Sequence, residues 1–254
     1  MLNQILMDLQ KIDMWKQKRG NLEFELRQLI ELHKDKTMEK SIENQKEILV
    51  LKIGRYNEKI EEVFLKLLNV TLTENELICS QQHEIVTRLS EVQTCEKSRV
   101  KAIRILKLIE EIKQLLISAK KYSIWDIIGS SLFVDMSKNS KLRQAQEMMN
   151  TLKQRVSEFN GETGKVRVDT TVQVRNAGLL LASDYIFDDI FSAMRTNEKI
   201  NAALMRMEKA EETFQSVIED LSEKKAELES ELEKMKIEFL DDLLKLCEYE
   251  HTSS

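Results

Sequence analysis

The sequence predicts an elongated all-α protein of antiparallel helical hairpins and coiled coil, with a small, mostly helical head. The chain has no proline and only six glycines in 254 residues. These two residues interrupt helices more strongly than any others, so few positions force a helix to end. Apolar residues recur at intervals of three and four, the spacing of helices that pack side by side. Because 42% of the residues are hydrophobic, the composition also excludes a disordered chain.

Residues 1–72 are predicted to form an N-terminal helical hairpin. In the first half, apolar residues recur every three or four positions: Leu2, Ile5, Leu9 and Ile12. In the second half, they recur every seven positions: Ile42, Leu49, Tyr56 and Val63. The polar run at 33–37 separates the two stripes and is the expected turn, although without glycine or proline it could also continue the helix.

Residues 73–120 are predicted to form the ascending helix of a coiled-coil arm. Thr73 and Glu76 have the spacing of a capping box, so this helix is expected to begin near Glu74. Its apolar stripe is narrow at first and broadens between Ile103 and Ile117. An apolar arc that wide requires burial on several sides of the helix.

Residues 198–250 are predicted to form the descending helix of the arm. Its apolar residues alternate at intervals of three and four: Ile200, Ala203, Met207, Ala210, Phe214, Val217 and Leu221. The phase then slips by four residues, and Leu228, Leu232, Met235 and Phe239 continue the repeat. Such a slip locally unwinds a supercoil without ending it. Since the two arm helices have similar lengths, we expect them to pair antiparallel within one chain, with Ile103–Leu116 beside Ile200–Phe214.

Residues 121–197 break this pattern and are predicted to form the head, which contains four of the six glycines. The segment 165–175 is the one non-helical signal, because its β-branched residues alternate with polar ones: Val166, Val168, Thr170, Val172 and Val174. A single strand leaves its backbone hydrogen bonds unmade. The segment is therefore expected to fold back near Asp169, to pair with another copy, or to be an extended loop.

Two segments of the head, 123–138 and 183–191, contain the candidate structural and interaction residues. The candidates are Trp125, Asp126, Gly129, Lys138, Asp184, Tyr185, Phe187 and Asp188. Gly129 allows another helix to approach closely, and Asp184 and Asp188 share one face of a helix.

The carboxylates of the head also support an alternative, in which the head is an acidic metal-binding or catalytic module. The residues of that module would be Asp126, Asp135, Asp184 and Asp188. Buried carboxylates more often pair with basic residues or cap helices, so the structural interpretation is preferred. The chain has no P-loop, HExxH or other standard catalytic motif, and we expect no catalytic residue, cofactor or metal.

Short motifs in the two head segments resemble an uncharacterised family of bacterial coiled-coil proteins. The matching residues are Trp125, Asp126 and Gly129, then Lys138 and Ser140, then Asp184, Tyr185, Phe187 and Asp188. Ser130 stands where that family has a second glycine. The resemblance covers roughly residues 120–230 and implies an architecture and a bacterial origin, but no established activity.

Charge and cysteine usage bear on partners and location. The net charge of −5 argues against nucleic acid as a partner. Residues 198–250 contain 16 acidic and 8 basic residues. The acidic surface of this helix is either simply exposed to solvent or contributes to the specificity for a partner through its charge. Three cysteines without ligand-like spacing, and an amphipathic N-terminus unlike a signal peptide, predict a cytoplasmic protein.

These features together predict a non-enzymatic scaffold or protein-interaction component that self-associates through helix–helix contacts. A membrane-associated coiled-coil protein is a second alternative, since the head is rich in aromatic residues. Binding to a membrane surface needs a basic face beside the aromatic one, and Asp126 and Asp135 oppose it. The sequence does not specify a small-molecule ligand.

Overall fold

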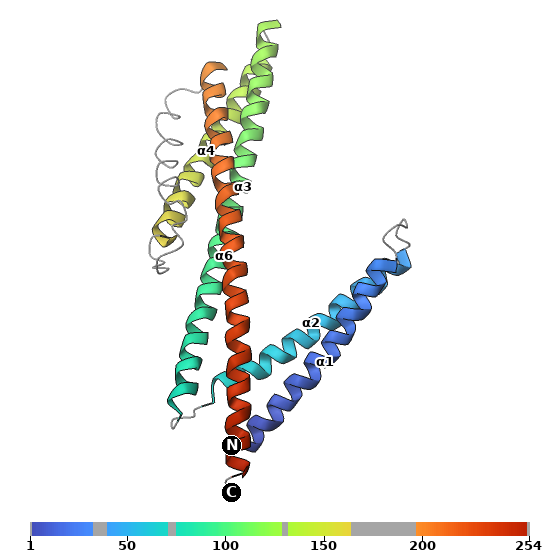
Figure 1. Cartoon of the computed structure of the whole chain (residues 1–254). Helices are drawn as coiled ribbons and strands as arrows, with labels where there is room; N and C mark the ends of the chain where they lie inside the picture. Colours follow the sequence, from blue (N-terminus) through green and yellow to red (C-terminus); the bar gives the residue numbers. More distant parts are fainter. Residues whose placement is uncertain (1, 33–39, 71–74, 129–131, 164–196, 253–254) are drawn as a thin grey trace. The chain divides into compact units, whose positions relative to one another are not determined.

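The computed structural model describes residues 2–32, 40–70, 75–128, 132–163 and 197–252, and nearly all of them are helical (Figure 1). The helices in these ranges are α1 (Leu2–Leu32), α2 (Lys40–Leu68), α3 (Glu76–Ile128), α4 (Leu132–Thr163) and α6 (Asn197–Thr252). The prediction of an all-α fold is confirmed, and the described ranges contain no strand. The possible β element at 165–175 lies outside them.

The helices build two compact units, and α3 and α6 each contribute to both. Unit 1 comprises Met1–Arg88 and Glu231–Ser254, and unit 2 comprises Leu89–Ser230. Unit 1 thus contains α1, α2, the beginning of α3 and the end of α6. Unit 2 contains the rest of α3, all of α4 and the first part of α6.

In unit 1, α1 and α2 lie side by side and form an antiparallel hairpin (Figure 1). The Arg19 guanidinium donates a hydrogen bond to the side-chain oxygen of Asn57 at 3.2 Å. Nearby, the Lys59 ammonium lies 5.9 Å from the centre of the Trp15 ring. Both contacts join the middle of α1 to the second half of α2, as expected for an antiparallel pair joined by a short connection.

The end of α2 packs against the C-terminal part of α6 in the core of unit 1. The rings of Phe64 and Phe239 meet edge to face, with centroids 6.0 Å apart and planes at 77°. The Lys236 ammonium lies 4.9 Å from the centre of the Phe64 ring and donates hydrogen bonds to the Glu61 carboxylate at 2.7 and 3.0 Å. The ammonium group of this lysine therefore lies over an aromatic ring while its charge is paired with a carboxylate.

The beginning of α3 is also part of unit 1 and runs antiparallel to the end of α6. The Gln81 amide donates a hydrogen bond to the Asp242 carboxylate at 2.9 Å, and Arg88 pairs with Glu231 at 3.3 Å. The side-chain oxygen of Asn75 accepts a hydrogen bond from the backbone N–H of Ile78 at 3.1 Å. Asn75 is thus the N-cap of α3, two residues after the Thr73 that the sequence suggested, because its short side chain reaches the third helical N–H.

Unit 2 is a bundle of three helices, in which α3, α4 and α6 surround one continuous core (Figure 1). Its α3 and α6 run antiparallel: Lys113 pairs with Glu211, and Lys225 pairs with Glu96 at 3.2 Å. The Cys95 thiol donates a hydrogen bond to the backbone oxygen of Leu221 at 3.2 Å. The predicted antiparallel pairing of these two helices within one chain is confirmed.

The third helix of the bundle is α4, which runs parallel to α6 and places Phe159 against Phe214. Their rings meet edge to face, with centroids 6.0 Å apart and planes at 61°. The buried residues of α4 alternate at intervals of three and four: Leu142, Ala145, Met149, Leu152, Val156 and Phe159. With α4 and α6 both packed against it, α3 buries the centre of the apolar arc that the sequence showed, from Ile105 to Leu116, whereas Ile103 at its edge stays 40% exposed.

Candidate interaction surfaces

The residues that the sequence analysis selected fall at the edge of the described structure or beyond it. Trp125 and Asp126 lie in the last two turns of α3, and Asp135 and Lys138 lie near the start of α4. The side chains of these four residues are outside the described part. The remaining selected residues lie outside the described ranges altogether: Gly129, Asp184, Tyr185, Phe187 and Asp188. Their assignment as interaction or metal-binding residues stays a prediction.

The described residues include no group of three histidine, cysteine or carboxylate side chains placed to hold a metal ion. In the same ranges, no helix is long and apolar enough to pass through a membrane. Two grooves lie between helices, one in each unit.

The first feature is the distal hairpin, which we define as residues 20–31 of α1 and 42–55 of α2. Large apolar side chains are exposed on it: Phe24, Ile30, Ile48, Val50 and Leu51. Phe24 and Leu51 are the most open, at 63% and 62% exposure. Leu49 is the one buried side chain in these two segments. The distal hairpin thus exposes more large apolar side chains than it buries. In a helical bundle whose apolar faces are covered, most large apolar side chains are buried.

The hairpin groove, between α1 and α2, has a volume of about 400 Å³. The residues that line it are Glu25, Gln28, Leu29, Gln45, Ile48, Leu49 and Lys52. Its apolar residues therefore come from both helices, and it has one acidic and one basic side chain. The distal hairpin as a whole is nearly neutral, with five acidic and four basic residues. Such a surface does not repel a second copy of itself.

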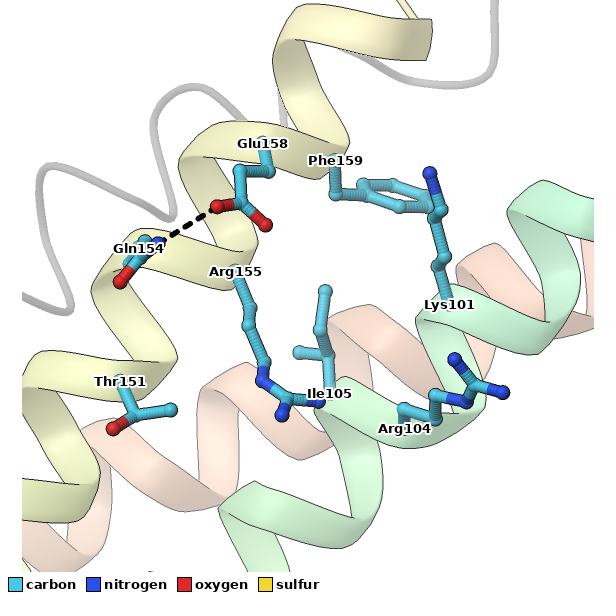
Figure 2. A pocket seen from close by; sticks show the side chains of 8 residues that line it. All are labelled: Lys101, Arg104, Ile105, Thr151, Gln154, Arg155, Glu158 and Phe159. Carbon is cyan, nitrogen blue, oxygen red and sulfur yellow. Dashed lines mark hydrogen bonds between the residues drawn. The ribbon is translucent and has the colours of Figure 1, made fainter.

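The second feature is the basic groove of unit 2, between α3 and α4, with a volume of about 430 Å³ (Figure 2). The residues that line it are Lys101, Arg104, Ile105, Thr151, Gln154, Arg155, Glu158 and Phe159. Figure 2 shows Lys101 and Arg104 on α3, opposite Arg155 on α4. Ile105 and Phe159 also line the groove but are core residues of the bundle, only 2% and 1% exposed, so they present almost no surface to it.

The basic groove is lined by three basic side chains and only one carboxylate, that of Glu158. The Glu158 carboxylate accepts a hydrogen bond from the Gln154 amide at 2.8 Å. Arg104 and Arg155 are exposed, and neither has an ion-pair partner among the described residues. Three cations and one carboxylate therefore line this groove.

The neighbouring part of α3 adds to this positive charge. From residue 97 to residue 109 the helix has five basic residues and no acidic one. Of these, Arg99 is engaged by Glu96, with nitrogen–oxygen distances of 2.9 and 3.0 Å. Hydrogen bonds from Arg99 and then Lys225 hold the pKa of Glu96 far below its ordinary value, at about 2. Glu96 thus balances positive charge at the contact between α3 and α6.

Comparison with known proteins gives no match to any family model, curated protein or solved structure. The function of this chain therefore has to be inferred from its own residues. The resemblance of its head motifs to bacterial coiled-coil proteins stays a prediction.

Neither groove was identified from the sequence, but the sequence contains a signal for one of them. The run of basic residues at 97–107, uninterrupted by acidic residues, marks one wall of the basic groove. Arg155 is far away in sequence, so only the packing of α4 against α3 brings it to the same place. The exposed residues of the distal hairpin, such as Phe24 and Leu51, lie off the apolar stripes and look like ordinary isolated surface residues.

Proposed function

We propose that this chain is a non-enzymatic scaffold that self-associates through its distal hairpin. One observation carries the proposal: the two paired segments of the distal hairpin expose Phe24, Ile48 and Leu51, whereas Leu49 is their one buried side chain. Full burial of one such side chain stabilises a protein by about 1.5–3 kcal/mol, so leaving several of them in water forgoes a large contribution. Helices gain most of their stability in water when an apolar face packs against other helices. In a hairpin of two helices, each helix has only one neighbour, so its apolar face is covered only in part.

A second copy of the chain is the partner that the charges of the hairpin groove favour. Glu25 lies on α1 and Lys52 on α2, so the groove has one side chain of each charge. A two-fold axis brings the same surface of two copies together, and each contact then occurs twice. In such a dimer Glu25 of one copy can face Lys52 of the other, while Ile48 and Leu29 supply apolar contacts.

The same proposal places the scaffold in the cytoplasm. The three cysteines are present as thiols, and Cys95 and Cys247 are buried in helix contacts. Buried thiols of this kind act as small apolar residues and persist in a reducing compartment. A bacterial origin follows only from the resemblance of the head motifs.

Self-association is tested by measuring the molar mass of the full chain over a range of concentrations, by sedimentation or light scattering. We expect a reversible dimer, and the substitution Ile48→Glu should weaken it because a charge would then enter the apolar groove. Met205→Glu is the matched control, since Met205 is 70% exposed and lies in unit 2.

The two variants should keep the helical circular dichroism of the wild type, because both positions are exposed. A wild-type chain that stays monomeric at every concentration would overturn the proposal. Equal weakening of the dimer by Ile48→Glu and Met205→Glu would also contradict it, because the contact would then not depend on the hairpin groove.

A further inference from the structure

We infer that the basic groove of unit 2 binds a short chain of phosphate groups, either free polyphosphate or the phosphate tail of a nucleotide. This interaction goes beyond self-association, because it uses residues of α3 and α4 and none of the distal hairpin. The guanidinium groups of Arg104 and Arg155 carry the inference, and Lys97 and Lys107 extend their positive charge along α3.

The two arginines come from opposite walls of the groove and are open to a ligand. Both are exposed, and neither has an ion-pair partner among the described residues. Lys101 also lines the groove, but it has an interaction of its own. Figure 2 shows the guanidinium groups of Arg104 and Arg155 toward one end of the groove and the carboxylate of Glu158 toward the other. An anion between the two arginines would therefore meet two cations and stay away from the carboxylate.

The groove offers a ligand charge and hydrogen bonds, and almost no apolar surface. Its two apolar residues, Ile105 and Phe159, are buried in the core of the bundle. A ligand that gains its affinity from apolar contacts, such as an amphipathic helix or a lipid chain, therefore gains little here. A phosphate group instead has a high charge and several acceptor oxygens, and the planar guanidinium group donates two parallel hydrogen bonds to it.

The positive charge continues along α3 on both sides of Arg104. Lys97 lies about two helical turns before this arginine and Lys107 about one turn after it, so the three exposed side chains share one side of the helix. No acidic residue interrupts the segment 97–109. The row from 97 to 107 is about 15 Å long, which a single phosphate cannot span and a chain of several phosphates can. A long nucleic acid is disfavoured by the net charge of −5 and by the acidic residues of α6.

Because the two arginines belong to different helices, the ligand would bridge α3 and α4. It would then bind the packed bundle and not the unfolded chain. Such a ligand raises the midpoint of thermal unfolding as its concentration rises. This stabilisation is a second measure of binding, independent of the heat of the titration.

The probe for this inference is inorganic triphosphate, titrated into the full chain in a calorimeter at constant ionic strength. Constant ionic strength keeps the screening of exposed charges the same at every point. We expect saturable binding of one triphosphate per chain, and much weaker binding of orthophosphate, which reaches fewer cations. Similar binding of ATP would identify the nucleotide tail as a source of the phosphate chain, whereas binding of triphosphate alone would identify free polyphosphate.

The variants remove two charges in the groove and two elsewhere. Arg104→Gln combined with Arg155→Gln should weaken binding by at least about tenfold, since charge-assisted hydrogen bonds are lost on both walls. Arg104→Lys combined with Arg155→Lys keeps the charge without the paired donors and should retain only part of the affinity. Lys18→Gln combined with Lys234→Gln makes the same charge change at exposed positions of unit 1 and should leave binding unchanged. Ile48→Glu should bind triphosphate normally, which separates this result from self-association.

All of these variants should keep the helical circular dichroism of the wild type, because the positions are exposed. Three outcomes would overturn the inference. The first is the absence of saturable triphosphate binding by the wild type. The second is equal binding by the glutamine variant of the groove and the unit 1 control, which would show general charge attraction. The third is that a single-stranded oligonucleotide, an acidic peptide or vesicles containing anionic lipid bind through Arg104 and Arg155 while triphosphate does not.

Discussion

The contact between Phe159 and Phe214 offers the most direct test of α4 as the third helix of unit 2. Both side chains are fully buried, and their rings meet at 6.0 Å with an angle of 61°. Replacing either phenylalanine by leucine removes ring atoms from the core and should lower the free energy of unfolding by about 1–2 kcal/mol. The edge-to-face geometry should add a coupling of about 0.5–1.5 kcal/mol between the two positions.

A double-mutant cycle measures this coupling directly. The free energies of unfolding of the wild type, Phe159→Leu, Phe214→Leu and the double variant come from urea titrations followed by circular dichroism. The pair of Phe64 and Phe239 in unit 1 has nearly the same geometry, with centroids also 6.0 Å apart, and serves as a matched cycle. Zero coupling at 159 and 214, with normal coupling at 64 and 239, would refute the packing of α4 against α6.

Two further predictions concern the ends and charges of the helices. The pKa of Glu96 is lowered from 4.5 to about 2, so its paired form should stabilise the fold above pH about 4.5 and lose this effect as the pH falls toward about 2. Glu96→Gln should remove that part of the pH dependence of the urea midpoint, and an unchanged profile would contradict the pairing. Asn75→Ala should lower the free energy of unfolding by about 1 kcal/mol, because the N-cap of α3 is lost, whereas Asn75→Asp should retain most of it. Equal losses in the two variants would show that Asn75 does not act as a cap.

Much of the fold was predictable because heptad spacing depends only on neighbouring residues in the chain. The stripe from Ile200 to Leu221 predicted a helix with one buried face, and Ile200, Met207 and Phe214 are all fully buried. The antiparallel pairing of α3 and α6 followed from their similar lengths. Both inferences use local spacing or chain connectivity, which a sequence displays directly.

That α4 belongs to the bundle of unit 2 was harder to predict from the sequence, although Leu142, Met149 and Val156 recur every seven residues. Glycine and aromatic residues on either side of this stripe led residues 121–197 to be treated as one head. Whether a stripe belongs to a separate head or to a bundle depends on which helices lie beside it. The same reason hid the basic groove, whose walls at Arg104 and Arg155 meet only through tertiary packing.

The amount of buried surface along this chain follows the number of helices that pack together. Where α3, α4 and α6 form a bundle, α3 buries a residue at every interval of three or four: Ala102, Ile105, Ile109, Ile112, Leu116 and Ala119. In the distal hairpin, where two helices pair, the repeat continues but only Leu49 is buried. Among the described residues, the difference therefore lies in the number of helices that pack together and not in the spacing of apolar residues. A further helix packed on the hairpin groove would bring its burial toward that of the bundle, and in the dimer proposed above a second copy of the chain would supply that helix.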